Sequence, residues 1–177
     1  MTTVEIIRPQ DSLPPEVGAS IFDLANTTWP PADAAQPPNL AETLARWKAQ
    51  GSVHFVIGAP QVLAHAMIFR REIITTRGPL WVGALATVCV HLEHRGRGWG
   101  ADVVRAAFGY LPELGVEVAL FQTGVPQFYE RLGGCLISNR FFNGDDPDNP
   151  FWDACEMIYP AAFDWPEGAI DLNGAGY

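Results

Sequence analysis

A short segment rich in glycine and arginine carries the clearest chemical signal in this sequence. Residues 95–100 read Arg-Gly-Arg-Gly-Trp-Gly, so three glycines and two arginines fall within six positions. Glycine allows sharp backbone bends that leave N–H groups uncovered, and uncovered N–H groups in succession attract anions. The two arginines add positive charge. The segment therefore predicts a binding site for a phosphate or a pyrophosphate.

Two regular elements must flank this segment to position it. The apolar run at residues 80–92 has the composition of a strand that is buried on both faces of a sheet. Apolar residues follow the segment at helical spacing and predict an amphipathic helix: Val103, Val104, Ala107, Phe108, Leu111 and Leu114. A strand that passes through a glycine turn into a helix brings uncovered N–H groups to the positive end of the helix dipole.

Two other interpretations of the segment stay open. Gly96, Gly98 and Ala101 also match the dinucleotide-binding pattern G-x-G-x-x-G/A. That pattern directly follows the first strand of its unit, whereas here residues 93–95 intervene and about eighty residues precede the strand. A glycine turn that binds nothing is the second alternative.

The composition limits the class of protein. With 177 residues, of which 48% are hydrophobic and 18% charged, the chain is expected to form one domain over residues 1–177 with a substantial core. It shows neither a membrane-spanning stretch nor a secretory signal, so we expect a cytoplasmic protein. The net charge of −9 argues against nucleic-acid binding. Cys89, Cys135 and Cys155 lie in apolar segments and predict reduced thiols rather than disulfides or a metal site.

Charge is distributed unevenly along the chain. Six of the eleven Lys and Arg residues lie between positions 70 and 105, whereas residues 141–177 contain eight Asp and Glu residues and no basic ones. One part of the chain therefore suits an anion and another part suits a cation. An enzyme that joins an anionic donor with a cationic acceptor would need this division. The alternative is that the acidic C-terminal part only keeps the protein in solution.

The remaining patterns predict a mixed α/β sheet of about six to seven strands with four helices. The expected strands are residues 4–8, 53–57, 62–74, 80–92, 116–123, 135–142 and 154–159. The expected helices follow Pro14 and Asn39, the glycine-rich segment and Val125. Asn39 is expected to cap the second helix, with Glu42 at the capping-box position and Gly51 at its end.

The motif Arg95-x-x-Gly98-x-Gly100 after an apolar strand resembles the acyl-CoA pyrophosphate loop, Q/R-x-x-G-x-G/A, of the GNAT superfamily of N-acetyltransferases. Downstream, Phe128-Tyr129-x-x-x-Gly133 is similar to a later motif of the superfamily, in which a helix Tyr lies beside the sulfur of CoA.

Two further stretches resemble particular members of the superfamily. Residues 63–73 look like the hairpin before the central strand of aminoglycoside 2'-N-acetyltransferases, and residues 164–168 resemble the D-W-x-x-G near the end of those enzymes. The continuation at residues 170–174 is closer to the tail of nodulation protein A, an acyltransferase of related fold.

The resemblance implies a GNAT fold with splayed central strands and acetyl-CoA as the acyl donor. The acetyl group would pass to a primary amine of a small cationic acceptor, such as an aminoglycoside or a polyamine, by direct attack. The donor diphosphate would lie on the loop formed by Arg95, Gly96, Arg97, Gly98, Trp99, Gly100 and Ala101. The pantetheine arm would pair with the backbone of Val88, Cys89 and Val90, where one N–H polarises the thioester carbonyl, which implies an irregular strand there.

Tyr129 matches the family Tyr and is the candidate general acid. A phenol has a pKa near 10, so it is protonated at neutral pH and can return a proton to the departing thiolate. The alternative is a core Tyr that contributes packing, which is the role we expect for its neighbour Phe128. Cys89 as a covalent nucleophile is disfavoured because no base is adjacent in the sequence.

The general base is the point at which the sequence departs from the aminoglycoside enzymes. Those enzymes carry a Glu on the central strand where this chain has Ala86. Water or another side chain must then take the proton, and the candidates are Glu72, His65 and His91, with Glu72 as the choice for the site. Each could equally be an ordinary surface or core residue.

Asp153 matches an Asp that contacts the cationic substrate of the aminoglycoside enzymes, so the resemblance implies acceptor binding there. The partners are then a small amine and, compatible with the sequence, a second copy in a homodimer. Two other functions stay open. One is transfer of a longer acyl chain, as in nodulation protein A, and the other is a non-catalytic acyl-CoA-binding module, which the absence of a carboxylate at Ala86 favours.

Overall fold

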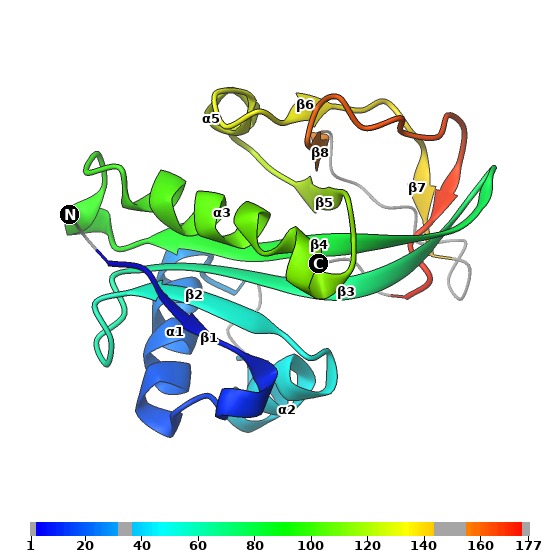
Figure 1. Cartoon of the computed structure of the whole chain (residues 1–177). Helices are drawn as coiled ribbons and strands as arrows, with labels where there is room; N and C mark the ends of the chain where they lie inside the picture. Colours follow the sequence, from blue (N-terminus) through cyan, green and yellow to red (C-terminus); the bar gives the residue numbers. More distant parts are fainter. Residues whose placement is uncertain (1–2, 32–36, 144–154, 175–177) are drawn as a thin grey trace. The chain divides into compact units, whose positions relative to one another are not determined.

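A computed structural model of the chain describes residues 3–31, 37–143 and 155–174 (Figure 1). The residues group into two compact units. The first is formed by Met1–Phe69 and Ala86–Gly109, and the second by Arg70–Leu85 and Tyr110–Tyr177. The long strands β3 (Ala64–Thr75) and β4 (Gly78–Val90) contribute residues to both units.

The first unit is a sheet covered by helices. Strand β1 (Glu5–Ile7) pairs antiparallel with β2 (Val53–Ile57), and β2 pairs antiparallel with the beginning of β3. All five residues of β2 are buried, so both faces of this sheet must be covered. Figure 1 shows α1 (Pro15–Thr28) and α2 (Leu40–Ala49) on one side of these strands and α3 (Trp99–Gly109) on the other.

Local signals explain where the helices of the first unit begin and end. Helix α1 starts at Pro15, where the missing N–H costs nothing because the first turn has no acceptor for it. The side chain of Asn39 accepts a hydrogen bond from the Glu42 N–H at 3.1 Å, so the predicted cap of α2 is confirmed. Helix α3 buries the stripe of apolar residues predicted from its spacing: Val103, Val104, Ala107 and Phe108.

The second unit continues the same strands into a mixed sheet. Strand β4 pairs in parallel with β5 (Ala119–Gln122), which pairs antiparallel with β8 (Glu156–Tyr159), and β8 pairs with β6 (Cys135–Leu136). Strand β7 (Phe141–Phe142) pairs in parallel with β9 (Ile170–Asp171), which also meets β3. The short helices α4 (Leu111–Leu114) and α5 (Pro126–Glu130) complete the unit.

The core of the second unit draws on β3, on β4 and on segments from the C-terminal half of the chain. Its central members are Ile73, Val82, Val118, Leu120, Phe141, Ile158, Ile170 and Leu172, all of which are buried. The prediction of a mixed α/β sheet is confirmed. None of the described helices is long and apolar enough to cross a membrane.

Two details of the predicted fold are wrong. The helix expected to run through Leu114 breaks after Gly109, because Pro112 has no N–H for the preceding turn and its ring obstructs the carbonyl of Phe108. The strand expected at residues 135–142 is divided into β6 and β7, because the chain changes its partner strand there. The Ile137 N–H still donates to the Glu156 carbonyl of β8, whereas the Arg140 carbonyl accepts from the Ile170 N–H of β9, and between them the Asn139 side chain bonds to Pro166 and Gly168. Strand β9 was not predicted.

Candidate functional site

The glycine-rich loop has the backbone form of an anion-binding nest. Gly96 and Gly98 have φ of 79° and 85°, whereas Arg97 between them is not in the left-handed region. Alternation of handedness makes successive N–H groups converge on one point. In the part of the chain that the structure describes, the N–H groups of Gly96, Gly98 and Gly100 have no hydrogen-bond acceptor. No heavy atom lies within 4 Å of where a Cβ would be on Gly96 or Gly98, so the concave side is open.

Helix α3 begins immediately after the nest and adds its dipole to it. The first bond of the helix is donated by the Asp102 N–H to the Gly98 carbonyl at 3.1 Å. The preceding N–H groups therefore point out of the first turn, and the positive end of an eleven-residue helix faces the same place. This arrangement can bind a phosphate without any side-chain contribution.

Arg95 connects the loop to the end of strand β4. Its Nε donates to the Val90 carbonyl at 3.2 Å, which folds the loop back on the strand. The guanidinium of Arg97 lies 5.7 Å from the ring centroid of Trp99, and that ring stacks on His94 at 5.1 Å. Both arginines are exposed, so their charges remain available to an anion in solution.

Strand β4 contains a local break in its geometry next to the predicted pantetheine positions. Thr87 has a φ of 52°, which is unusual for any residue except glycine and strained for a β-branched one. The residues after it are Val88, Cys89 and Val90, where the resemblance implied an irregular strand. The backbone irregularity therefore lies one residue before the stretch for which it was expected.

A pair of buried histidines contacts the strained residue. Nδ1 of His65 lies 2.9 Å from the Thr87 carbonyl oxygen, and Nε2 of His65 lies 3.1 Å from Nδ1 of His54. The two rings are 0% and 2% exposed. Burial lowers the pKa of His54 to about 4 and the pKa of His65 well below its ordinary value, so both are neutral at pH 7. His65 has both ring nitrogens bonded and no access to solvent, which removes it from the candidates for a general base.

Cys89 is a buried thiol rather than a nucleophile. Its side chain is 3% exposed and lies 3.7 Å from the Thr87 carbonyl oxygen. Burial raises its pKa to about 12, and the charge of Arg95 offsets only part of that rise. The thiolate needed for covalent catalysis is therefore scarce at neutral pH.

Tyr129 and Glu72 belong to the second unit. Tyr129 is on α5, 5% exposed, with its ring 4.6 Å from that of Phe121 and edge-on to Phe128 at 4.8 Å. Its packing role is thus established, as is that of Phe128. Glu72 is half-buried on β3, on the face opposite the fully buried Ile73. Asp153 lies outside the described residues.

His91 follows strand β4 and shares one property with Ser52, His94 and Gln122, which is a buried polar side-chain atom without a hydrogen-bond partner among the described residues. Its Nδ1 is buried and has no hydrogen-bond partner among the described residues. Its ring lies 5.6 Å from the ring of His94 in an edge-on contact. Its backbone N–H donates to the Leu63 carbonyl at 2.8 Å, so the residue is held in place. His91 stays a candidate for the base.

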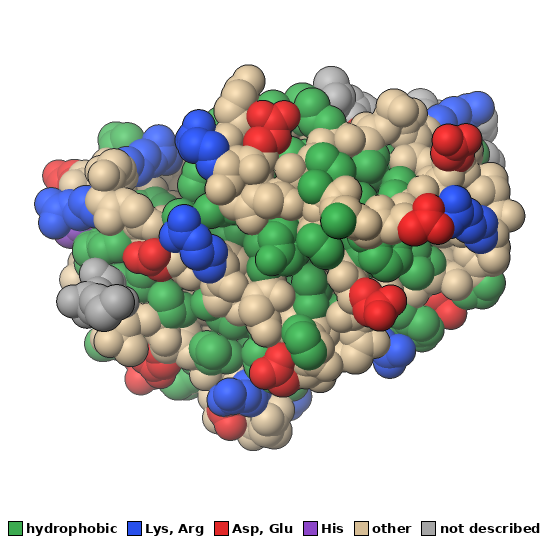
Figure 2. All heavy atoms as spheres, turned by 45° about the horizontal axis from the view of Figure 1, so that its top comes forward, with side chains coloured by type: hydrophobic (Ala, Val, Ile, Leu, Met, Phe, Trp, Pro, Cys, Tyr) green, Lys and Arg blue, Asp and Glu red, His purple; other side chains and the backbone are tan. Residues whose placement is uncertain are grey.

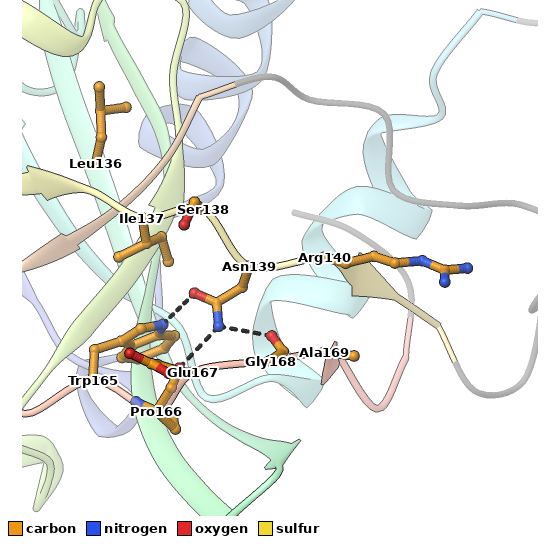
Figure 3. A pocket seen from close by; sticks show the side chains of 10 residues that line it. All are labelled: Leu136, Ile137, Ser138, Asn139, Arg140, Trp165, Pro166, Glu167, Gly168 and Ala169. Carbon is orange, nitrogen blue, oxygen red and sulfur yellow. Dashed lines mark hydrogen bonds between the residues drawn. The ribbon is translucent and has the colours of Figure 1, made fainter.

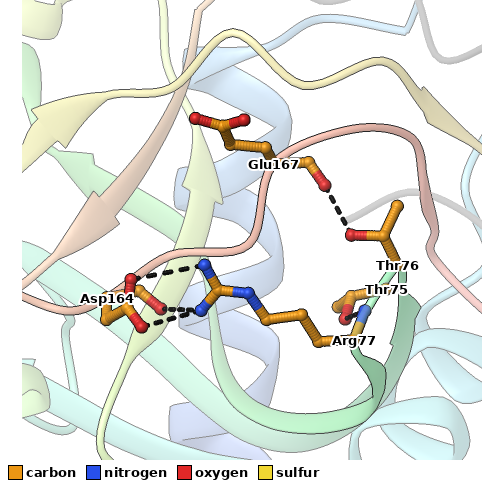
Figure 4. Close-up of polar contacts among 5 residues, drawn as sticks. All are labelled: Thr75, Thr76, Arg77, Asp164 and Glu167. Carbon is orange, nitrogen blue, oxygen red and sulfur yellow. Dashed lines mark hydrogen bonds and ion pairs between the residues drawn. The ribbon is translucent and has the colours of Figure 1, made fainter.

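The C-terminal D-W-P-E-G motif is a structural clamp. Asp164 forms an ion pair with Arg77 at 2.7 Å, and the Glu167 carbonyl accepts from the Thr76 hydroxyl at 2.6 Å (Figure 4). Gly168 has a φ of 91°, and a Cβ there would lie 2.7 Å from Cγ2 of Thr76, so only glycine fits. The motif attaches the C-terminal segment to the turn between β3 and β4.

Asn139 closes this clamp from the other side. Its Nδ2 donates to the carbonyls of Pro166 and Gly168 at 2.9 and 2.8 Å, and its Oδ1 accepts from the Trp165 indole at 2.8 Å (Figure 3). These residues line an open cavity of about 850 Å³ in the second unit. The Asn139 amide thus makes all three of these hydrogen bonds with residues 165–168.

Among the described residues, several of the charges that were expected to be divided by sign are used in structural contacts. Arg77 and Asp164 neutralise each other, Arg71 donates to the Leu172 carbonyl at 2.8 Å, and the Arg70 guanidinium lies 4.0 Å from the centroid of the Trp81 ring. Figure 2 shows Lys, Arg, Asp and Glu side chains scattered over the visible face rather than gathered by sign. These described charges are therefore used for structure. Half of the acidic residues at positions 141–177 lie outside the described residues: Asp145, Asp146, Asp148 and Asp153.

Sequence reasoning missed the features that hold the site together. Thr87, the His54–His65 pair and Asn139 were not predicted in these roles, because each depends on a contact between residues distant in sequence. The only local signal is an isolated His on each of two neighbouring apolar strands.

Comparisons with known proteins agree with the loop geometry. The chain is similar in structure to the GNAT family N-acetyltransferase YhbS from Escherichia coli, solved in complex with CoA, with 15% identity, a TM-score of 0.67, and coverage of 98% of this chain and 91% of that one. It is also similar to glucosamine-6-phosphate N-acetyltransferase from Arabidopsis thaliana, with 16% identity, a TM-score of 0.58, and coverage of 85% and 99%.

A third similar structure is longer than this chain. The GCN5-related N-acetyltransferase from Kribbella flavida has 16% identity and a TM-score of 0.60, and 76% of this chain covers 33% of that one. The chain thus spans about a third of that relative. A comparison with curated protein sequences finds no match.

The family model described as an acetyltransferase (GNAT) domain matches residues 17–135, which include the nest, α3 and strand β4. Because that match covers more than half of the sequence, the chain belongs to the GNAT acetyltransferase family, as the loop motif predicted.

Proposed function

We propose that this protein is an N-acetyltransferase that moves an acetyl group from acetyl-CoA to a primary amine of a small cationic acceptor. The observation that carries the proposal is the nest at Gly96 and Gly98, whose open N–H groups stand at the start of α3. A diphosphate is the group that this combination of uncovered N–H groups and helix dipole suits best.

In this proposal the donor lies along two adjacent stretches of the first unit. The diphosphate binds at residues 95–101, and the pantetheine arm pairs with the backbone of Val88, Cys89 and Val90. One of these N–H groups donates to the thioester oxygen and stabilises the negative charge that develops there. The strained backbone at Thr87 would turn these N–H groups away from ordinary strand pairing.

The chemistry is a direct attack. The lone pair of the neutral amine forms the new C–N bond while the C–S bond breaks, and the thiolate leaves with the electron pair. The nitrogen then carries one hydrogen too many for an amide and loses it to the phenolate that remains once the acid has protonated the thiolate. Tyr129 is proposed as the acid that protonates the thiolate. The ammonium form of the acceptor must first lose a proton, either to water or to a side chain, for which Glu72 is the first choice and His91 the second.

For the acceptor we propose an amine that carries more than one positive charge, such as an aminoglycoside or a polyamine. The resemblance of residues 63–73 and 164–168 to aminoglycoside 2'-N-acetyltransferases supports this choice, and so does Asp153, through its match to an acceptor-binding Asp. Residues 164–168 give less support than residues 63–73, because their D-W-P-E-G motif forms a structural clamp, and a clamp needs no particular substrate.

The test is release of free CoA thiol from acetyl-CoA in the presence of a panel of amines. We expect thiol release with at least one polyamine or aminoglycoside, and Tyr129→Phe should lower the rate, with Phe128→Leu as a packing control that keeps the phenol. An unchanged rate for Tyr129→Phe would remove Tyr129 from the mechanism. The panel should include longer acyl-CoAs, because transfer only from those would replace acetyl-CoA as the donor.

A second candidate is a module that binds acyl-CoA without turnover. The observation that favours it is Ala86, which leaves the central strand without a carboxylate where the aminoglycoside enzymes have one. The same assay distinguishes the two. A rise in melting temperature with acetyl-CoA but no thiol release with any amine would favour the binding module.

A further inference from the structure

The strained conformation of Thr87 must be maintained by its surroundings. A β-branched residue with a φ of 52° persists only where neighbouring contacts determine its backbone. Its carbonyl oxygen contacts Nδ1 of His65 at 2.9 Å and the Cys89 thiol at 3.7 Å. A thiol is a weak donor, so the imidazole is the stronger of the two contacts.

The hydrogen bonds allow one arrangement of protons. A carbonyl oxygen can only accept, so Nδ1 of His65 must carry the hydrogen. Nε2 of a neutral His65 is then an acceptor, and Nδ1 of His54 must donate to it. The depressed pKa values of both groups agree with two neutral rings. His54 therefore fixes the tautomer of His65, and His65 fixes the carbonyl of Thr87.

The pair is rigidly packed. The two imidazole rings stack at 5.4 Å, and Trp47 of helix α2 lies edge-on to His54 at 5.2 Å. Neither ring reaches solvent enough to exchange partners. Two polar rings buried at this depth are costly unless their hydrogen bonds are kept, so the arrangement of the pair is strongly determined.

We propose that His65, supported by His54, is a positioning residue for the acyl donor. By holding the Thr87 carbonyl, it fixes the peptide plane that contains the Val88 N–H, and so it sets the direction in which the strand continues through Cys89 and Val90. The inference rests on the proposed function, since it is the pantetheine arm and the thioester that meet these groups. The contacts of the pair do not involve residues 95–101, and the described link between this stretch and the glycine-rich loop is the bond from Arg95 Nε to the Val90 carbonyl at 3.2 Å.

This division makes a prediction that a purely structural role does not make. Acetyl-CoA would contact both the nest and the strand, whereas 3'-phosphoadenosine 5'-diphosphate, the nucleotide part of CoA, would contact only the nest. Loss of the His65 bond should therefore weaken acetyl-CoA and leave the nucleotide fragment unaffected. General loosening of the first unit would weaken both ligands together.

The experiment measures both affinities by calorimetry for the unmodified protein, His65→Leu and His65→Asn. Leucine has a similar volume and no donor, whereas the amide of asparagine can place an N–H close to the position of Nδ1. We expect His65→Leu to weaken acetyl-CoA by about tenfold, the equivalent of one lost hydrogen bond, with the fragment within about twofold. His65→Asn should recover most of the loss.

Nitrogen NMR of the unmodified protein supplies a second measurement that needs no variant to fold. We expect a protonated Nδ1 and a bare Nε2 on His65, and a protonated Nδ1 on His54. A protonated Nε2 on His65 would overturn the inference. So would equal weakening of both ligands in His65→Leu, or an affinity for acetyl-CoA that does not change.

The failure of the proposed function looks different. If the unmodified protein binds neither acetyl-CoA nor the fragment, the donor assignment is wrong, and the positioning role falls with it. If the unmodified protein binds both and the two affinities do not separate in His65→Leu, only the positioning role is wrong.

Discussion

Removal of the Asn139 amide should loosen the C-terminal segment. Its side chain makes three hydrogen bonds, to Trp165, Pro166 and Gly168, at 2.8–2.9 Å. Each such bond contributes about 0.5–1.5 kcal/mol net, so Asn139→Ala should lower the free energy of unfolding by about 3 kcal/mol. Water can hydrogen-bond to some of the groups that lose Asn139 and recover part of this loss. The smallest expected decrease in the free energy of unfolding is therefore about 2 kcal/mol.

The measurement is urea unfolding followed by circular dichroism. With a slope of about 2 kcal/mol per molar urea, the midpoint should fall by about 1 M or more. Ser138→Ala is the matched control, since Ser138 is its exposed neighbour in the same cavity lining, and it should change the free energy by less than about 0.5 kcal/mol.

A second comparison separates the amide from the ion pair. The side chains of Arg77 and Asp164 are 54% and 88% exposed, so water screens their attraction. Arg77→Ala should therefore cost less than about 1 kcal/mol. The clamp interpretation is refuted if Asn139→Ala unfolds at the same urea concentration as the unmodified protein. It also fails if the exposed ion pair turns out to contribute more than the amide.

Three further predictions concern the first unit. Burial lowers the pKa of His54 from 6.5 to about 4, so as the pH falls the unfolded chain takes up a proton before the folded chain does. The free energy of unfolding should therefore have its full value above pH 6.5. It should decrease by about 3 kcal/mol toward pH 4 from His54 alone. Urea unfolding at pH 7.5, 6 and 4.5 measures this, and His54→Gln should flatten the profile; an equally steep profile in that variant would contradict the assignment. Glycine inside a strand usually lowers the free energy of unfolding by about 0.5–1 kcal/mol. Thr87→Gly should cause no such loss in urea unfolding, because glycine adopts a φ of 52° without strain. A loss of the usual size would show that the strain is absent. Cys89 should react with iodoacetamide at pH 8 far more slowly in the folded than in the urea-unfolded protein, because burial raises the pKa of its thiol to about 12. Mass spectrometry measures the two rates. Equal rates would contradict the burial of Cys89.

Features that depend on neighbouring residues could be predicted from the sequence. The glycine-rich turn, the start of α3 and the Asn39 cap each depend on a few adjacent residue types, and all three are present in the structure. The resemblance that identified the family depended on the same loop. Local chemistry of this kind is readable because the backbone responds to it before any tertiary contact forms.

Features that depend on contacts distant in sequence could not be predicted. His65 meets the carbonyl of a residue 22 positions later, and Arg77 meets Asp164 across 87 positions. No periodicity in the sequence marks such contacts. Thr87 shows the same limit, because a β-branched residue predicts a regular strand and only the surrounding packing can impose a left-handed backbone on it.

The central claim is that the nest at Gly96 and Gly98 binds the diphosphate of an acyl-CoA. The most direct test is calorimetric titration of acetyl-CoA into the unmodified protein, Gly98→Glu and the control Gly115→Glu. Gly98 and Gly115 have φ of 85° and 68° and open space around the Cβ position, so both variants place a side chain on a backbone with positive φ. Only the first places a carboxylate among the N–H groups, where repulsion of about 4 kcal/mol at 4 Å should weaken binding by at least about 100-fold.

We expect acetyl-CoA to bind the unmodified protein and Gly115→Glu with similar affinity and to show no measurable binding to Gly98→Glu. Undiminished binding to Gly98→Glu would contradict the assignment of the diphosphate to this loop, and so would the absence of binding to the unmodified protein.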